Sequence, residues 1–434
     1  MRSGRLHIAL IAALAIYATL LIGTGTSAAA QEMLLHSFRP YGSPPCCFHA
    51  RTADGFDPFY SNLTIDTAGN LYGTTTAGGI FGYGTVFKLT HTASGWTEAV
   101  IYAFGHNLAD GGVPEGGLTL DAAGNLYGTT HGGGANNSGV VFELVNNGDG
   151  TWAEKVLYSF NNTDGYGPWA APIFDAAGNL YGTTESGGAY NYGTAYELTP
   201  TGGGNWSEQV LHSFGNGTDG ATPFAGLVMD AAGNLYGTTW LGGANLCDGA
   251  GCGTVFKLSP TGGGNWSEQV IHNFINNGVD GNQPWAGSLI FDSSGNLYGT
   301  TTLGGTYLCE GGSVGCGTVY EMTPTAGGNW TEQVIYSFNG GGPGGEDPTS
   351  AVLFDAAGNL YGTTYFGGLL EGGTAFKLTL RDGRWTEQVL HPFGASGDGV
   401  TPASGLIFDR AGNLYGTTME GGLYDGGTAY EITP

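Results

Sequence analysis

Charged residues are scarce in this sequence: they make up 11% of its 434 residues, and Lys and Arg together number 11 against 36 Asp and Glu. A chain with a net charge of −25 and so few basic residues offers no basic surface to a polyanion, which excludes nucleic acid as a partner. A sustained apolar period of 3.6 residues is also missing, so helices should be nearly absent. The many Gly-rich stretches are not followed by the Lys that a phosphate-binding loop needs.

The N-terminal segment has the order of regions found in secretory signals. Arg2 and Arg5 precede an apolar run at 8–22, after which small residues follow. We therefore predict a signal peptide over 1–30 and a single mature domain over 31–434. The competing interpretation is a retained membrane anchor, because the apolar run is close to spanning length. We expect a secreted protein, in the extracellular space, the periplasm or at the cell surface, with no membrane contact after cleavage.

The six cysteines are typical of an exported protein, because disulfides persist in oxidising compartments. Cys247 and Cys252 enclose a short Gly-rich loop, and so do Cys309 and Cys316. We predict one local disulfide in each loop, with a metal site as the competing interpretation. The adjacent cysteines at 46–47 lie closer together than disulfide geometry prefers, so their state is left open.

One unit repeats throughout the chain after residue 30. The heptapeptide Gly-Asn-Leu-Tyr-Gly-Thr-Thr occurs seven times at spacings of 54 to 63 residues, and the two longest intervals hold the cysteine loops. Its copies begin at Gly69, Gly124, Gly178, Gly233, Gly295, Gly358 and Gly412. So regular a period indicates a repeat architecture in place of several globular domains.

Each unit contains four short stretches with the composition of β-strands, as at 405–409, 413–418, 253–258 and 266–274. An Asp-x-x-Gly-Asn turn joins the first two, and a linker such as 260–265 separates the third from the fourth. Apolar side chains on both faces of each stretch fit a propeller blade, whose sheet lies between two neighbours. We predict an all-β fold: a seven-bladed β-propeller with four antiparallel strands per blade.

The two ends of the predicted mature chain complement each other. The last unit stops after its third strand at 427–434, whereas 32–38 matches the fourth strand of another unit at 208–214. Pairing of these ends would place the N-terminal strand in the last blade, close the ring and remove exposed sheet edges. An open solenoid is the alternative, but it would need distinct polar caps, which we do not find.

The repeat resembles known families. Its Asp-x-x-Gly-Asn-Leu-Tyr element is similar to that of NHL-type and gluconolactonase-like propellers. The longer pattern, the heptapeptide with a following Gly-Gly, Gly-Thr-x-Phe/Tyr and Trp-x-Glu-x-Val, resembles the GloVer-type tandem repeat of exported bacterial "choice-of-anchor" proteins. This resemblance covers the predicted mature chain and implies a secreted or surface-displayed repeat protein. Family members often have a C-terminal sorting segment, which we do not find, so we do not expect attachment through one.

A second repeated motif, Asp-Gly-x-x-Pro, lies between the fourth strand of one unit and the first strand of the next. A ring of carboxylates near the mouth of a central channel would suit Ca²⁺ or the hydroxyls of a glycan. The candidate metal ligands are Asp54, Asp110, Asp164, Asp219, Asp280 and Asp398. The alternative is structural, because Asp-Gly shapes a turn and Pro fixes the entry into the strand. Apart from Ca²⁺ at these positions, we predict no cofactor.

The loops between strands four and one and between strands two and three should emerge on one face, which holds the cysteine loops. Trp169, Trp240 and Trp285 depart from the repeat in these loops, so we predict that they bind a ligand. Other tryptophans recur at the start of the fourth strand, where we expect them to anchor neighbouring blades. These are Trp96, Trp152, Trp206, Trp266, Trp330 and Trp385.

We therefore expect a monomeric binding or surface-interaction module whose partner is a protein or a polysaccharide. The alternative is a lyase or lactonase-type hydrolase that works in the central channel with Ca²⁺. Lactonases of this type depend on channel residues that differ from blade to blade, whereas we expect the corresponding positions here to repeat almost unchanged. No combination of Ser, His and Asp stands out from the repeat, so we assign no catalytic residue and favour a binding role.

Overall fold

The computed structural model describes residues 30–40, 54–107, 109–247, 249–309 and 315–434. Residues 1–29 of the predicted signal peptide and the cysteines at 46–47 lie outside this part of the chain. Within it the structure is almost entirely β, and the one helical segment is a short 3₁₀ turn, η1, at Ala326–Gly328. None of the helical structure described there has the length and apolar character needed to span a lipid bilayer.

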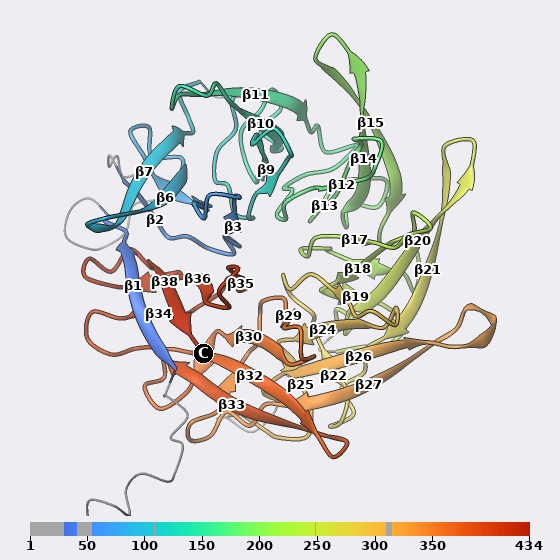
Figure 1. Ribbon diagram of the computed structural model, residues 1–434. Coiled ribbons are helices and arrows are strands. Elements are labelled where there is room, and N and C mark those ends of the chain that lie inside the picture. Colours follow the sequence, from blue (N-terminus) through green and yellow to red (C-terminus); the bar gives the residue numbers. More distant parts are fainter. Residues whose placement is uncertain (1–29, 41–53, 108, 248, 310–314) are drawn as a thin grey trace, which may run out of the picture.

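Seven four-stranded sheets form a ring around a central axis, with a short strand innermost and a long strand outermost (Figure 1). Neighbouring strands within each sheet are antiparallel, which confirms the predicted seven-bladed β-propeller. We number the blades in chain order and give their strands from the axis outward.

Blade 1 consists of β3 (Thr64–Ile65), β4 (Leu71–Thr75), β6 (Thr85–Thr92) and β7 (Gly95–Ala103). Blade 2 consists of β8 (Thr119–Leu120), β9 (Leu126–Thr130), β10 (Val140–Asn146) and β11 (Trp152–Ser159). Blade 3 consists of β12 (Ile173–Phe174), β13 (Leu180–Thr184), β14 (Thr194–Gly202) and β15 (Asn205–Ser213). Blade 4 consists of β17 (Val228–Met229), β18 (Leu235–Thr239), β20 (Thr254–Gly262) and β21 (Asn265–Asn273).

Blade 5 consists of β23 (Ile290–Phe291), β24 (Leu297–Thr301), β26 (Thr318–Pro324) and β27 (Trp330–Ser337). Blade 6 consists of β29 (Leu353–Phe354), β30 (Leu360–Thr364), β32 (Thr374–Arg381) and β33 (Arg384–Pro392). Blade 7 consists of β35 (Ile407–Phe408), β36 (Leu414–Thr418), β38 (Thr428–Thr433) and, outermost, β1 (Gln31–Ser37).

Small two-stranded sheets join the loop that enters a blade to the loop that follows its second strand. They are β2 (Gly55–Phe56) with β5 (Ala77–Gly78), β16 (Gly220–Ala221) with β19 (Leu241–Gly242), β22 (Gly281–Asn282) with β25 (Leu303–Gly304), β28 (Gly345–Glu346) with β31 (Phe366–Gly367), and β34 (Gly399–Val400) with β37 (Glu420–Gly421). Single bridges, Gly112 to Gly132 and Tyr166 to Ser186, take their place in blades 2 and 3. The two kinds of loop therefore lie together on one face, as predicted.

The ring closes through the first and last of these strands. β1 pairs antiparallel with β38, so that Gln31 lies opposite Thr433 and Leu34 opposite Tyr430. Just beyond β1, the N–H of Phe38 donates a hydrogen bond of 2.9 Å to the carbonyl of Gly427. These contacts confirm the predicted closure and leave blade 7 with four strands, like the others.

The repeated heptapeptide supplies the second strand of each blade, whose five residues Leu-Tyr-Gly-Thr-Thr are buried on both faces. In blade 4 a Cβ on Gly237 would lie 2.6 Å from Cζ of Phe256, so only glycine lets this aromatic ring cross the strand. In blade 3 the hydroxyl of Thr183 donates to the carbonyl of Ala225 in the next blade at 2.9 Å. The motif thus serves packing within and between blades.

The Asp-x-x-Gly-Asn turn between the first two strands is closed by its aspartate. In blade 4 Oδ1 of Asp230 accepts the N–H groups of Ala232 and Asn234, both at 2.9 Å. Oδ2 accepts the side-chain amide of Asn234 at 2.7 Å and the hydroxyl of Tyr236 at 3.0 Å. Burial would raise the pKa of Asp230, but these hydrogen bonds outweigh it and lower the pKa. The aspartate therefore has a structural role.

The expected linker at 260–265 is instead part of a hairpin, and this prediction was wrong. β20 continues to Gly262, which pairs with Asn265 at the start of β21. Gly263 (φ 64°) and Gly264 (φ 82°) lie between them with positive φ, as a tight two-residue hairpin turn requires. The Gly-rich composition therefore marks a turn that extends the two outer strands.

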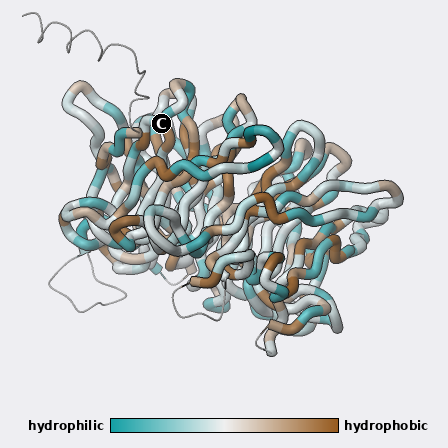
Figure 2. The backbone as a smooth tube through the Cα atoms, turned by 90° about the horizontal axis from the view of Figure 1, so that it is seen from below, coloured by the Kyte–Doolittle hydropathy of each residue, from teal (hydrophilic) through white to brown (hydrophobic). Residues whose placement is uncertain are grey.

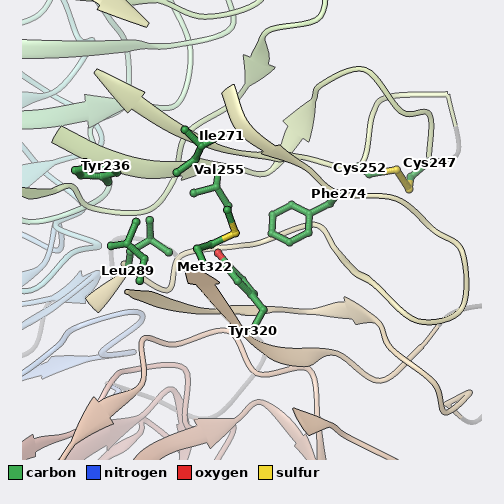
Figure 3. Packing of buried hydrophobic residues seen from close by; sticks show 10 residues of the cluster. Tyr236, Cys247, Cys252, Val255, Ile271, Phe274, Leu289, Tyr320 and Met322 are labelled. Atoms are coloured by element: carbon green, nitrogen blue, oxygen red, sulfur yellow. A yellow bond between two sulfur atoms is a disulfide. The ribbon is translucent and has the colours of Figure 1, made fainter. Parts of the chain in front are cut away.

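Adjacent blades pack face to face, and we call each such interface a seam. In every seam a phenylalanine that follows the outer strand of one blade meets an aromatic ring on the third strand of the next, with ring centroids 4.8 to 5.2 Å apart. The pairs are Phe38–Phe87, Phe104–Phe142, Phe160–Tyr196, Phe214–Phe256, Phe274–Tyr320, Phe338–Phe376 and Phe393–Tyr430. Figure 3 shows the seam between blades 4 and 5.

The repeated tryptophans also contact the neighbouring blade. Trp266 of blade 4 meets Tyr181 of blade 3 at 6.1 Å, and Trp330 of blade 5 meets Tyr236 of blade 4 at 5.7 Å. These contacts confirm the predicted anchoring role for Trp266 and Trp330. In the view turned by 90°, hydrophobic stretches recur from blade to blade along the ring (Figure 2).

The seam that β1 completes gives a first testable prediction. Phe38 is fully buried against Phe87, so Phe38→Ala should lower the free energy of unfolding by about 3–5 kcal/mol and make the N-terminal strand sensitive to protease. Met33 on β1 is 44% exposed, so Met33→Ala serves as the matched control with little effect. Urea titration and limited proteolysis measure both, and equal losses in the two variants would contradict the closure.

Candidate binding site at the channel mouth

Two positions on the loop face near the axis differ from blade to blade, and we call the region they line the mouth. One follows the proline of Asp-Gly-x-x-Pro or its counterpart in blade 6, and the other follows the heptapeptide. In blades 1 to 7 the first position holds Phe59, Glu115, Trp169, Phe224, Trp285, Thr349 and Ala403. The second holds Thr76, His131, Glu185, Trp240, Thr302, Tyr365 and Met419. The expectation that these inner positions repeat almost unchanged was therefore wrong.

A strained turn fixes the side chains of the mouth. The residue before each proline has positive φ, and six of these residues are not glycine, with φ between 55° and 61°. They are Asp57, Val113, Thr222, Gln283, Asp347 and Thr401. In blade 4 the N–H of Thr222 donates to the carbonyl of Tyr192 in blade 3, and its carbonyl accepts from Trp240. Such a conformation is costly for β-branched residues and persists because the surroundings over-determine it.

The two predicted disulfides, Cys247–Cys252 and Cys309–Cys316, are present, and their loops brace the mouth. The carbonyl of Cys252 accepts the N–H of Gln283 at 2.8 Å, and the carbonyl of Cys316 accepts the N–H of Asp347 at 3.0 Å. Each disulfide therefore holds the strained turn of the following blade, two residues before a side chain that lines the mouth.

The three tryptophans predicted to bind a ligand converge at the mouth. Trp240 lies 4.7 Å from Trp285, and Trp285 lies 6.4 Å from Trp169, between ring centroids. Phe224 fills the space between them, 4.6 Å from Trp169 and stacked on Trp285 at 4.8 Å. Tyr60 of blade 1 completes the cluster, 5.8 Å from Trp169. Sequence reasoning missed Phe224 and Tyr60, although a comparison of the position after the proline across the repeats would have found Phe224.

Two cavities lie beside this aromatic cluster. One, of about 270 Å³, is lined by Tyr60, Trp169 and Phe224 and by the innermost strands or their entries in blades 1 to 5. The other, of about 280 Å³, is lined by Tyr60, Trp240, Trp285 and Tyr365. Larger hollows of about 630 and 520 Å³ lie on the outer rim, where repeated residues of the outer strands line them. We favour the mouth over the outer rim as the candidate binding site because the residues that line the mouth vary from blade to blade.

Several polar atoms at the mouth are buried without a hydrogen-bond partner among the described residues. They include the indole Nε1 atoms of Trp169 and Trp240 and one carboxylate oxygen of Glu115. A buried donor or acceptor without a partner costs about 1–3 kcal/mol, so these atoms favour a polar ligand or water at the mouth.

Acidic and imidazole groups gather on the side of the mouth formed by blades 1 to 3. Nε2 of His131 lies 3.0 Å from Oε1 of Glu185. Burial would lower the pKa of His131, but the bond to Glu185 and the charge of Glu115 outweigh it and raise the pKa. Burial raises the pKa of Glu115 to about 7 and that of Asp57 to about 6. These two carboxyl groups on this side of the mouth can therefore stay protonated at a pH close to neutral.

The six candidate metal ligands do not line the mouth. Each lies at the outer rim, where a histidine or tyrosine of the outer strand contacts it across a seam, at distances of 2.6 to 3.2 Å. The pairs are His36–Asp54, Tyr102–Asp110, Tyr158–Asp164, His212–Asp219, His272–Asp280 and His391–Asp398. Each Asp-Gly-x-x-Pro loop runs from the rim towards the axis. Its aspartate therefore lies at the rim, and its proline lies at the mouth.

A glutamate from the next outer strand adjoins each of these pairs. In the seam between blades 1 and 2, burial together with the charge of Asp110 raises the pKa of Glu154 to about 7. Burial and the charge of Asp164 likewise raise the pKa of Glu208 to about 7 in the seam between blades 2 and 3. Oε1 of each glutamate is buried without a partner among the described residues. The rim therefore holds carboxyls that favour their protonated form.

A family model places the chain among known repeat proteins. The Gloeobacter/Verrucomicrobia repeat model matches residues 40–249, 145–308 and 307–434. The chain belongs to the Gloeobacter/Verrucomicrobia repeat family. No curated protein sequence matches this repeat propeller.

Solved structures share the fold of this Gloeobacter/Verrucomicrobia repeat propeller at low identity. A polysaccharide lyase matches with a TM-score of 0.57 at 9% identity, over 93% of this chain and 98% of that one. The extracellular domain of a putative hybrid two-component system from B. thetaiotaomicron matches with a TM-score of 0.52 at 14% identity, over 87% of this chain and 39% of that one. A putative gluconolactonase matches with a TM-score of 0.40 at 18% identity, over 76% of this chain and 93% of that one. At these identities, the two likenesses above 0.5 show the fold and not the activity.

The buried glutamates of this repeat propeller predict a pH dependence. Because its folded pKa is about 7, above that of the free side chain, Glu154 supports the folded state at acidic pH, and this support is lost as the pH rises through about 7. Glu154→Gln should stabilise the protein at pH 8 relative to the unchanged chain, by about 1–2 kcal/mol after allowance for partial exposure. Urea titrations from pH 5 to 8 measure this. Glu371→Gln, at an exposed loop position, is the control, and an unchanged pH slope in Glu154→Gln would contradict the assignment.

Proposed function

We propose that this protein is an exported binding module that takes up a neutral polysaccharide at the mouth of its propeller. The observation that supports the proposal most strongly is the aromatic cluster of Trp169, Phe224, Trp285, Trp240 and Tyr60 beside two cavities. Aromatic rings supply flat apolar surfaces on which the apolar faces of sugar rings stack. The cluster lies where binding sites of ring-shaped folds are usually found, on loops held by a rigid scaffold.

The unpartnered polar atoms favour a ligand rich in hydroxyl groups. The indole N–H groups of Trp169 and Trp240 need acceptors, which sugar hydroxyl and ring oxygens can supply. Glu115 and Asp57 offer acceptors for sugar hydroxyl groups beside the aromatic cluster. An entirely apolar ligand would leave these groups unsatisfied, so we favour a carbohydrate over a lipid.

The charges of the mouth favour a neutral polysaccharide over a polyuronate. None of the residues that line the two cavities is Lys or Arg, whereas Asp347 lines one of them. The chain as a whole has a net charge of −25. An anionic sugar would meet repulsion there with no cation to offset it. Export, a monomeric state and the absence of membrane contact form part of the same proposal, and the two disulfides support an oxidising compartment.

Substitution at the centre of the aromatic cluster tests the proposal. Trp285→Ala removes the ring that contacts Trp169, Phe224 and Trp240, so we expect affinity for the bound polysaccharide to fall about tenfold or more. Calorimetry against soluble β-glucan, xylan, galactomannan and pectate measures it. Tyr190, which is 46% exposed on another loop, gives the matched control Tyr190→Ala.

Trp285→Phe keeps an aromatic face and should retain part of the affinity. A protein that binds none of the neutral chains, or pectate alone, would overturn the proposal. So would a loss of affinity in Tyr190→Ala equal to that in Trp285→Ala when the melting temperatures of both variants match the parent.

Acid–base cleavage of the bound chain is a second candidate function, favoured by Glu115. Its carboxyl has a pKa of about 7 next to the His131–Glu185 pair, which suits a group that gives or takes a proton at neutral pH. If this candidate holds, the protein releases reducing ends from the bound polysaccharide, and Glu115→Gln slows that release by about 10² or more while binding persists. Intact polysaccharide after long incubation with the unchanged protein would eliminate this candidate and leave the binding role.

A further inference from the structure

The seam between blades 4 and 5 brings together a histidine and two carboxylates from three separate segments. His272 lies on β21, Asp280 begins the loop that enters blade 5, and Glu332 lies on β27. One ligand atom from each lies within 4.8 Å of the others. The three side chains therefore surround one point between the two blades.

The spacing within this trio is that of metal ligands as well as that of a long hydrogen bond. Nε2 of His272 lies 3.2 Å from Oδ2 of Asp280, whereas a charge-assisted N–H···O bond is about 2.7–2.9 Å long. Two ligands of a tetrahedral Zn²⁺ with bonds near 2.0 Å are separated by about 3.3 Å. The equivalent pair between blades 3 and 4, His212 and Asp219, lies at 2.7 Å and forms an ordinary hydrogen bond.

Unpartnered carboxylate oxygens at the same point are available to a cation. Asp280 is 6% exposed, and its Oδ1 is buried without a partner among the described residues. Oε1 of Glu332 is buried and unpartnered in the same way. Two carboxylates that face each other in a buried place are stable when a cation or a shared proton lies between them.

The surroundings hold the ligands in place without a metal. The ring of Phe274 meets that of His272 edge-on, 4.7 Å between centroids, and Phe274 itself lies in the seam shown in Figure 3. The N–H of Ile275 donates to Oδ2 of Asp280 at 3.1 Å. Such outer contacts orient ligands and lower the cost of ordering them when a metal binds.

We propose that this seam binds Zn²⁺ through Nε2 of His272 and the carboxylates of Asp280 and Glu332, with water as the fourth ligand. One imidazole and two carboxylates suit Zn²⁺, whereas Ca²⁺ requires six to eight oxygens, more than these side chains supply. The ion links an outer strand of blade 4 to the loop and outer strand of blade 5. It acts as a crosslink between blades, and the site does not depend on what the mouth binds.

The same three residue types meet in two more seams. His36 and Asp54 lie 3.2 Å apart beside Glu98, and His391 and Asp398 lie 3.0 Å apart beside Glu32. In each trio one ligand atom per residue lies within 4.8 Å of the others. These seams lie on either side of blade 7, so they bind Zn²⁺ where β1 closes the ring.

Zinc titration of the chelator-treated full chain tests the proposal. We expect about three Zn²⁺ per chain by calorimetry and by metal analysis, and a higher melting temperature when zinc is added. Tyrosine occupies the position of His272 in the seams that begin with Tyr102, Tyr158 and Tyr336, so His272→Tyr is a substitution the fold already accommodates. It should remove about one Zn²⁺ per chain and part of the melting-temperature gain.

His212→Tyr is the matched control, because the pair at 2.7 Å should bind no ion, and its zinc content should stay that of the parent. Glu332→Gln provides a second variant, which should lose the same single ion while keeping the histidine. A chain that takes up no zinc, that prefers Ca²⁺, or that loses as much zinc in His212→Tyr as in His272→Tyr would overturn the proposal. Polysaccharide binding measured on the same variants should not change, which separates this test from that of the mouth.

Discussion

The structure depends on the packing of each sheet against two neighbours. The second strand of every blade is buried on both faces, and a phenylalanine from one blade meets an aromatic ring of the next in all seven seams. A blade with only one neighbour would expose one apolar face to water. Every blade therefore has both faces covered only when the ring is closed, and the pairing of β1 with β38 closes it.

The same packing explains where the protein can vary. Glycine, threonine and the aromatic residues of the repeat are needed in every seam, so a change there would be costly. The residues after the proline and after the heptapeptide vary between blades, and no two blades have the same pair. The candidate site thus lies where the repeat does not fix the residue. Aromatic rings line much of it, and Glu115, His131 and Glu185 adjoin them, with the ring of His131 6.1 Å from that of Trp169.

The sequence was sufficient to predict the blade number, the ring closure and both disulfides, because each follows from a motif or a match between segments. It also identified Trp169, Trp240 and Trp285, since they interrupt a repeat. It did not place Asp280 and its equivalents correctly, because one short loop spans the distance from rim to axis and sequence spacing does not show its direction. Tyr60 joins the cluster only through the curvature of the ring, which brings blade 1 next to Trp169 of blade 3.

The pairing of β1 with β38 also joins two segments that are far apart in the sequence. These strands are the first and last in the described chain, so their contact is among the slowest to form. Until it forms, β38 has a free edge of N–H and C=O groups that the β1 segment of another molecule could occupy equally well. Crowded, newly made chains are thus exposed to exchange of this strand, and dilute conditions favour the ring that closes on itself.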